Sequence, residues 1–159
     1  LNDETRGQAE TVTLGLAAYR DSDEAITIFN IDTLRPNFLY PSLDDLGDGY
    51  LEVFRGTGDN WSFVRPINSS TTIIDYTTEK NPISDLCCTG LYHFNNIQDY
   101  FSAYDYYLSL PKEKWEKGEL YVAPIYNYLI ENGSEIHYHL IERNDVIFCG
   151  TPAEYDSFR

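Results

Sequence analysis

Apolar and polar positions along the chain follow two different periods, which predicts strands interleaved with helices. Helical spacing of apolar side chains predicts three helices, over residues 9–20, 96–109 and 122–131. A capping pattern at Thr151 predicts a further helix at the end of the chain. Alternating or β-branched stretches predict strands over residues 25–31, 49–55, 61–66, 71–78, 87–94, 135–141 and 145–149. This mixture is typical of an α/β sheet with an antiparallel addition.

Composition narrows the class of protein. The chain has 159 residues, 42% of them apolar, so we expect a single globular domain over residues 1–159. Its formal net charge of −15 disfavours nucleic acid and anionic membranes as partners, because both present negative phosphates. Apolar runs are too short to span a membrane, and no signal-peptide pattern is seen. The adjacent Cys87 and Cys88 with the lone Cys149 do not suit a disulfide framework, so we expect reduced thiols in a cytoplasmic protein.

Asp32 is a candidate metal ligand. It follows the strand predicted over residues 25–31, which is apolar enough to be buried on both faces. In open α/β sheets the ligand crevice lies beyond the carboxyl ends of the strands. A carboxylate there suits Mg²⁺, which takes one or two carboxylates together with phosphate oxygens. A turn-capping Asp without any ligand fits the pattern as well, so the sequence leaves both roles open.

Glu79 and Lys80 form an adjacent acid and base at the end of a predicted strand. Neighbouring residues on a strand face opposite sides, so both side chains reach one ligand only where the strand ends or bulges. Asn81-Pro82 ends the strand at this point. The pair suits the hydroxyls and phosphate of a phosphorylated sugar, and it also suits a solvated surface pair.

Gly7 and Gln8 precede the first predicted helix. A glycine there lets a ligand approach the backbone, and the start of a helix favours anions, although an ordinary N-terminal turn explains the pattern too. Among the many aromatic residues, Trp61, Tyr92 and Tyr121 are candidate walls of a pocket.

Six segments, in this order, resemble the sugar-phosphate nucleotidyltransferases, and most of all their capsule and surface-polysaccharide branch. They are Gly-Gln-Ala-Glu-Thr at 7–11, Ile-Phe-Asn-Ile-Asp at 28–32, Trp-Ser-Phe-Val at 61–64, Glu-Lys at 79–80 with Thr-Gly-Leu-Tyr at 89–92, Gly-Glu-Leu-Tyr-Val-Ala-Pro-Ile-Tyr-Asn at 118–127, and Gly-Thr-Pro at 150–152. The resemblance implies a Rossmann-related, GT-A-like mixed sheet flanked by helices that lacks its first βαβ portion. The chain would be the substrate-side portion of such an enzyme.

The resemblance also implies a reaction, in which a nucleoside monophosphate passes from a nucleoside triphosphate to a sugar phosphate and pyrophosphate is released. Asp32 matches the family's Mg²⁺ ligand. Gly7 and Gln8 match the segment that meets the nucleotide base. On this basis we expect Mg²⁺ as cofactor, with Asp32 and Lys80 as the catalytic residues.

The remaining matches concern the sugar phosphate. Glu79 matches the acid on the sugar hydroxyls, and Lys80 matches the cation on the sugar phosphate. Thr89 and Gly90 match the segment that meets the sugar, and Ser62 stands where relatives often have a sugar-contacting Gly.

Three features depart from the family pattern. The N-terminal glycine-rich loop, with its catalytic Arg and following Lys, has no counterpart in the chain. Phe148 stands where some relatives have a second metal-ligating Asp, and Pro124 stands where others have Asp. Two alternatives therefore stay open: a glycosyltransferase of the same fold that uses a nucleotide sugar, and a truncated binding domain without activity. The sequence leaves open the base, the sugar and whether a homo-oligomer forms.

Overall fold

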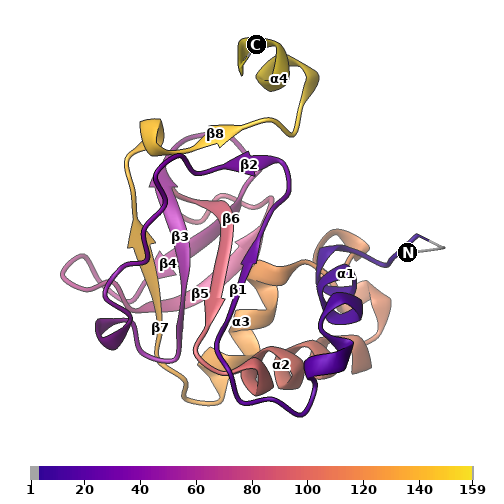
Figure 1. Ribbon diagram of the computed structural model, residues 1–159. Helices are drawn as coiled ribbons and strands as arrows, with labels where there is room; N and C mark the ends of the chain where they lie inside the picture. Colours follow the sequence, from indigo (N-terminus) through magenta and orange to yellow (C-terminus); the bar gives the residue numbers. More distant parts are fainter. Residues whose placement is uncertain (1–3, 159) are drawn as a thin grey trace.

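The computed structural model describes residues 4–158, which form a six-stranded mixed sheet with four α-helices (Figure 1). The strands of this sheet are β1 Ile26–Phe29, β3 Gly49–Arg55, β4 Ser62–Pro66, β5 Ile74–Glu79, β6 Leu86–Phe94 and β7 Ile136–Leu140. A second sheet pairs β2 Thr33–Leu34 with β8 Ile147–Phe148. The helices are α1 Gln8–Gly15, α2 Ile97–Ser109, α3 Val122–Glu131 and α4 Pro152–Phe158. Single 3₁₀ turns lie at Ala17–Tyr19, Leu43–Asp45, Lys112–Lys114, Glu116–Gly118 and Arg143–Asp145.

Strand β6 is the centre of the main sheet, and all of its residues are buried. One edge of β6 pairs with β3, while the other pairs with β1 and, nearer the start of β6, with β4. The order across the sheet is β5-β4-β6-β3-β7; β3 and β7 run parallel, and the other pairings among residues 4–158 are antiparallel. In Figure 1, α1, α2 and α3 lie together beside the sheet, and α4 lies apart from them beyond β8.

The helices and main strands lie where the apolar pattern predicts them. The prediction that the first strand is buried on both faces is wrong. In the described part of the chain β1 pairs only with β6, Phe29 is 41% exposed and Ile31 is fully exposed. An apolar run shows that a strand is suited to burial but does not show what covers it, so an edge strand and a central strand share this pattern.

An amide side chain of α3 fixes β5 against the helix layer. Asn127 Oδ1 accepts a hydrogen bond from the Thr77 main-chain N at 2.8 Å, and Asn127 Nδ2 donates to the Thr77 carbonyl at 2.9 Å. Asn127 and Thr77 are both buried, so the paired contacts satisfy groups that would otherwise be costly to bury. They hold β5 in place two residues before it ends at Glu79.

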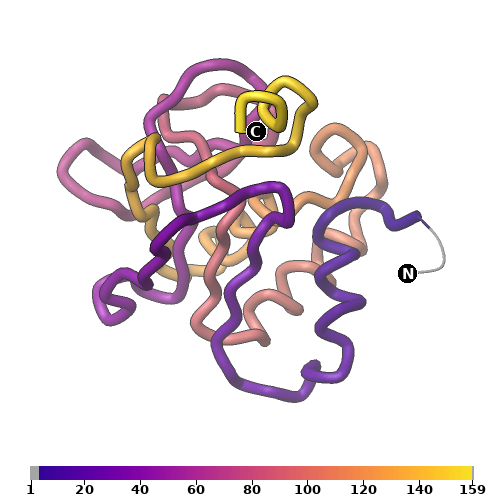
Figure 2. The backbone as a smooth tube through the Cα atoms, turned by 45° about the horizontal axis from the view of Figure 1, so that its top comes forward, coloured from indigo at the N-terminus to yellow at the C-terminus, as the bar shows by residue number. Residues whose placement is uncertain are grey.

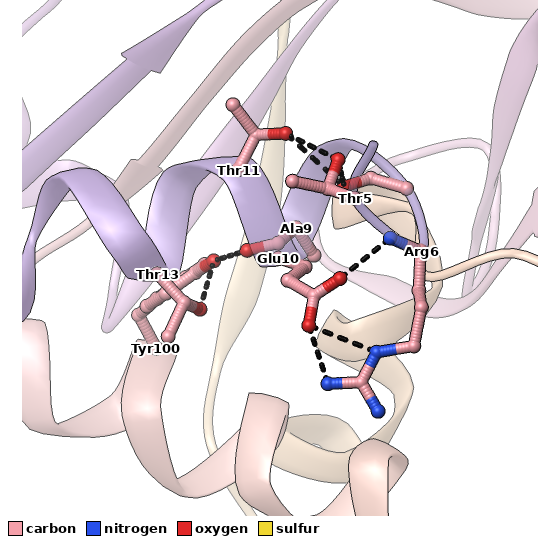
Figure 3. A network of polar contacts seen from close by, with 8 residues as sticks. Thr5, Arg6, Ala9, Glu10, Thr11, Thr13 and Tyr100 are labelled. Carbon is pink, nitrogen blue, oxygen red and sulfur yellow. Dashed lines mark hydrogen bonds and ion pairs between the residues drawn. The ribbon is translucent and has the colours of Figure 1, made fainter. Parts of the chain in front are cut away.

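Helix α1 is attached to α2 by polar contacts, which Figure 3 shows. The hydroxyl of Tyr100 on α2 donates to the carbonyl of Ala9 at 2.6 Å and lies 3.0 Å from the Thr13 hydroxyl. At the start of α1, the main-chain N of Arg6 donates to Glu10 at 2.5 Å, and the guanidinium of Arg6 pairs with the same carboxylate. These contacts fix the orientation of α1 and therefore the position of Gln8, its first residue.

The two-stranded sheet links the segment after β1 to the end of the chain. Thr33 pairs with Phe148, and the main-chain N of Cys149 donates to the carbonyl of Asp32 at 2.8 Å. Figure 2 shows the β8 segment passing close to the segment that follows β1. The strand β2 was not predicted, because a two-residue strand leaves no periodic pattern in the sequence.

The expectations about thiols agree with the structure. Cys87 and Cys88 are buried, Cys149 is half-buried, and none of the three is in a disulfide. Among residues 4–158, no helix combines the length and the apolar composition that a bilayer crossing requires.

Candidate functional site

A cavity of about 1070 Å³ opens at one end of the sheet and contains most of the predicted site. It lies where several elements start or end: the segment after β1, the start of β4, the end of β5 and the middle of β6. Of the predicted site residues, those that line it are Gln8, Asp32, Ser62, Glu79, Lys80, Thr89 and Gly90. The carboxylate, the acid–base pair and the Thr-Gly segment therefore share one cavity.

Asp32 lies at the exposed rim of this cavity. Its main chain is fixed by the hydrogen bond from Cys149. A Cβ atom on Gly150 would lie 2.7 Å from Asp32 Oδ2, so a side chain at Gly150 would displace the Asp32 carboxylate from its present position. The close approach of the Asp32 carboxylate therefore favours glycine at position 150, in addition to any role of Gly150 in the turn.

Glu79 is 5% exposed and lies opposite Ser62 in the register of β4 and β5. The Ser62 hydroxyl donates a hydrogen bond to the Glu79 carboxylate. Burial raises the pKa of Glu79, and the hydrogen bond from Ser62 and the charge of Lys80 only partly oppose this effect. The main-chain N of Glu79 donates to the side chain of Glu116, whose own pKa is also raised by burial.

Lys80 turns the chain away from β5 in a left-handed conformation, with φ of 52°. This turn lets two sequence neighbours line the same cavity, as the sequence predicts for a strand that ends there. The Lys80 ammonium donates to the Tyr121 hydroxyl at 3.0 Å, and this hydrogen bond raises the pKa of Lys80. The side chain of Lys80 is exposed, so its charge is available to a ligand.

Thr89 and Gly90 lie in a bulge of β6. The register shifts between Leu51 and Val53 of β3, and Gly90 adopts φ of 98°. A Cβ on Gly90 would lie 2.4 Å from Nδ2 of Asn30. Only glycine suits this position, because it permits both the left-handed backbone and the close packing of Asn30.

Gln8 reaches the same region from α1. Its amide nitrogen donates to Asn30 Oδ1, while its Oε1 accepts from the main-chain N of Val122 at 3.5 Å. Asn30 in turn donates its main-chain N–H to the Gly90 carbonyl at 3.0 Å. The position predicted to meet a nucleotide base and the position predicted to meet a sugar are thus joined through Asn30.

Gly7 is the predicted site residue that does not line the cavity. A Cβ at Gly7 would lie 2.6 Å from the carbonyl oxygen of Leu120. The Leu120 main chain also bonds on both sides of Gly7, with Arg6 and Ala9. Contact with Leu120 therefore explains why a glycine is needed there, and contact of Gly7 with a nucleotide base stays a prediction.

Aromatic side chains form much of the cavity wall. The three predicted candidates, Trp61, Tyr92 and Tyr121, all line it. Phe148 was not identified from the sequence as part of the cavity wall. In the structure Phe148 lines the cavity, and the centroid of its ring lies 4.7 Å from that of Trp61. Asn30 was missed too. It lies after the end of β1 at Phe29, where no periodic pattern in the sequence marks it.

The residues present fit a magnesium ion held mainly by phosphates. Among the described residues there is no group of three or more His, Cys, Asp or Glu side chains arranged to hold a metal. Asp32 supplies a carboxylate at the exposed rim, next to Gly150, and Glu154 also lines the cavity there. One carboxylate together with phosphate oxygens and waters is a normal environment for Mg²⁺.

The mixed sheet has the same fold as solved structures of nucleotide-sugar pyrophosphorylases. The chain is 59% identical to the nucleoside-diphosphate-sugar pyrophosphorylase from Vibrio cholerae, with a TM-score of 0.92, over 99% of this chain and 66% of that one. No protein-family model and no curated protein sequence matches it. The identity extends over nearly all of the chain, so the predicted resemblance to nucleotidyltransferases is confirmed.

More distant solved structures share the fold. A UDP-glucose pyrophosphorylase complexed with UDP-glucose is 12% identical, with a TM-score of 0.73 over 98% of this chain and 61% of that one. The inositol-1-phosphate CTP transferase from T. maritima is 14% identical, with a TM-score of 0.61 over 93% and 57%. The chain spans only part of the length of each of these proteins. The predicted fold class, a mixed α/β sheet flanked by helices, is confirmed.

Proposed function

We propose that the protein transfers a nucleoside monophosphate from a nucleoside triphosphate to a sugar phosphate and releases pyrophosphate. The observation that carries this proposal is that Asp32 lines the same cavity as the adjacent Glu79 and Lys80, which lie far from it along the chain. The 59% identity to a nucleoside-diphosphate-sugar pyrophosphorylase supports the same reaction. We further propose, from the sequence resemblance, that the product serves capsule or surface-polysaccharide synthesis.

The sugar phosphate would bind with its phosphate toward Lys80. The Lys80 ammonium has a raised pKa and stays charged at neutral pH, so it can pair with the phosphate dianion. The carboxylate of Glu79 would accept hydrogen bonds from sugar hydroxyls, with Ser62 fixing its orientation. The Thr89-Gly90 bulge would form the surface against which the sugar ring rests.

The reaction balances without a further reactant. A phosphate oxygen of the sugar phosphate attacks the α-phosphorus of the triphosphate and forms a new P–O bond. The bond from the α-phosphorus to its bridging oxygen breaks, and that oxygen leaves with the electron pair as part of pyrophosphate. Catalysis of this kind consists mostly of positioning and charge neutralisation.

On the nucleotide side, Asp32 would hold Mg²⁺, which supplies neutralisation of phosphate charge when it is bound. Gln8 would stand near the base, with its amide held by Asn30. The free thiols of all three cysteines support a cytoplasmic location, where nucleoside triphosphates are available.

The test uses the full-length protein and two measurements. Each nucleoside triphosphate is first screened with Mg²⁺ for a rise in melting temperature, because a ligand that binds the folded state stabilises it. The stabilising triphosphate is then combined with a panel of sugar phosphates, and pyrophosphate release is recorded. We expect one pair of substrates to release pyrophosphate well above either substrate alone.

The same assays separate the two alternatives. A glycosyltransferase would be stabilised by nucleotide sugars and would release a nucleoside diphosphate, with no pyrophosphate. A strict pair of acids around the metal site would favour it, whereas Asn30 stands two residues before Asp32 and is bonded to Gln8. A binding domain would be stabilised by ligands without turnover, and either result would contradict the proposed transferase.

A further inference from the structure

A buried ion pair lies next to the Thr89-Gly90 bulge and does not line the cavity. The guanidinium of Arg35 binds the carboxylate of Glu52 in two places, with Nε–Oε1 at 2.8 Å and Nη2–Oε2 at 3.2 Å. Side-chain exposure is 9% for Arg35 and 1% for Glu52. Burying two charges is expensive, and well-packed apolar residues in their place are often at least as stabilising. Stabilisation of the fold is therefore not a sufficient explanation for the presence of a buried ion pair at this position.

Glu52 lies opposite the bulge of β6 that contains Thr89. Leu51 pairs with Tyr92 and Val53 pairs with Cys88, so Glu52 alone faces the three intervening residues of β6. Glu52 Oε1 accepts a hydrogen bond from the Thr89 hydroxyl at 2.9 Å. An ionised acceptor makes a stronger bond than a neutral one, so this contact fixes the rotamer of Thr89.

Thr89 in turn makes hydrogen bonds that hold the backbone of the bulge. Its hydroxyl oxygen accepts from the main-chain N of Leu91 at 3.3 Å, and its carbonyl accepts from the Thr33 hydroxyl at 3.2 Å. Thr33 directly follows Asp32 in the chain. The network therefore reaches from the buried pair to both the sugar segment and the predicted metal ligand.

Arg35 connects the same network to the wall of the cavity that contains Phe148. Its Nη1 donates to the carbonyl of Asp145 at 2.5 Å, shortly before β8 begins. The guanidinium of Arg35, which follows β2, thus contacts both Glu52 on β3 and the turn before β8. A planar side chain with several donors in a fixed fork suits these simultaneous contacts, which accounts for arginine at this position.

We propose that Arg35 and Glu52 are positioning residues that hold the Thr89-Gly90 bulge in the conformation that receives the phosphorylated acceptor. The proposal rests on the proposed function, because it assigns the acceptor to this bulge. Arg35 and Glu52 do not line the cavity, so they act through Thr89 and not by contact with substrate. The competing explanation is that the pair only stabilises the fold.

Two double variants of the full-length protein separate these explanations. The first, Arg35→Met/Glu52→Leu, is called the apolar double variant, and it removes both charges and the acceptor for the Thr89 hydroxyl. The second, Arg35→Met/Glu52→Gln, is called the amide double variant, and it removes the same charges but keeps an oxygen that can accept from Thr89. Replacing both members of the pair avoids leaving an unpaired buried charge, which is what makes single variants prone to unfold.

In steady-state assays we expect the apolar double variant to raise KM for the sugar phosphate about tenfold and KM for the triphosphate much less, because the lost hydrogen bond is made directly to Thr89 in the sugar segment and reaches the nucleotide side only through further contacts. The amide double variant should bring KM for the sugar phosphate part of the way back to the wild-type value, because it keeps the acceptor for Thr89 but still lacks the contacts that Arg35 makes with Glu52 and with the Asp145 carbonyl. Equal KM values in the two variants would overturn the proposal, since their charges are the same and only the hydrogen-bond acceptor differs.

Amide hydrogen exchange provides a measurement that does not depend on turnover. The main-chain N–H groups of Leu91 and Asn30 are both bonded to the bulge. Their exchange should be faster in the apolar double variant, by about tenfold, and should change less in the amide double variant, which keeps the acceptor for Thr89. Unchanged exchange in both variants would refute the positioning role. Absence of pyrophosphate release from the wild type, with the expected exchange, would instead contradict the proposed function alone.

Discussion

The Ser62 hydroxyl donates a hydrogen bond to the Glu79 carboxylate across the pairing of β4 with β5. This contact orients an acid that is almost fully withdrawn from water. Its neighbours Cys88 and Tyr92 are buried as well, and burial raises the pKa of both. These parts of the cavity wall are thus largely shielded from solvent, and a hydrogen bond or charge placed there is stronger than at the surface.

Glu79→Gln should change the pH dependence of stability. Because burial raises the pKa of Glu79, the folded protein binds this proton more tightly than the unfolded chain does. The stabilisation is fully present below the unfolded value, near 4.5, and is lost as pH rises through the folded pKa. A neutral Gln should therefore raise the melting temperature at about pH 8 and lose that advantage at about pH 4.

Differential scanning calorimetry at the two pH values measures this change. Glu113→Gln is the control, because it removes the same charge from an exposed position on a 3₁₀ turn. A gain from Glu79→Gln that is equal at both pH values would contradict the assigned cause. The same variant should also lower kcat/KM for the sugar phosphate, since an amide accepts hydrogen bonds more weakly than a carboxylate.

Asp32→Ala tests the magnesium assignment. We expect kcat/KM for pyrophosphate release by the full-length protein to fall by at least about a hundredfold, because charge neutralisation provides much of the catalysis. The melting temperature should stay near that of wild type, since the Asp32 side chain is exposed. Asp44→Ala removes the same charge outside the cavity and should keep full activity. Turnover retained by Asp32→Ala would remove Asp32 from the metal site.

Lys80→Ala should raise KM for the sugar phosphate by about tenfold and KM for the triphosphate much less, because the lost contact is a charged one to the acceptor phosphate. Lys80→Met is the matched control, since it keeps the length of the side chain without its charge. If both substrates are affected equally, Lys80 does not bind the acceptor. Tyr121→Phe should cause a smaller rise, because it removes only the hydroxyl that holds the ammonium at 3.0 Å.

The local parts of this site could be predicted from the sequence. Glu79 and Lys80 were expected to share a ligand because Asn81-Pro82 ends the strand, and they do line one cavity. Asp32 was expected beyond the end of a strand for a similar reason. In each case the decisive information, a strand and the residue that ends it, lies within a few positions of the chain.

Longer-range relationships could not be predicted. In the sequence Glu52 is one polar residue in an apolar strand, and only the folded bulge brings it to Thr89, which is distant along the chain. Gly7 was expected to admit a ligand to the backbone, which stays a prediction, and nothing in the sequence indicated that the main chain of Leu120 packs closely against it. A glycine shows that something approaches closely, and the sequence does not say what it is.

Gly90→Ala should be the most disruptive small change in the cavity. The added methyl group would require φ of 98° from an alanine and would lie 2.4 Å from Nδ2 of Asn30. Gly133→Ala shares the strained backbone, with φ of 91°, but its methyl group would meet no atom within 4 Å. We expect Gly133→Ala to lower the free energy of unfolding by about 1–2 kcal/mol, from backbone strain alone.

Gly90→Ala should lower the free energy of unfolding by about 1–3 kcal/mol more than Gly133→Ala, because overpacking is added to the strain. Denaturation in urea measures both variants. The displaced Asn30 would release Gln8, so Gly90→Ala should also weaken triphosphate binding, whereas Gly133→Ala should leave it unchanged. Equal losses of stability in the two variants would show that Asn30 moves aside at little cost, and that the bulge does not depend on its contact with the segment after β1.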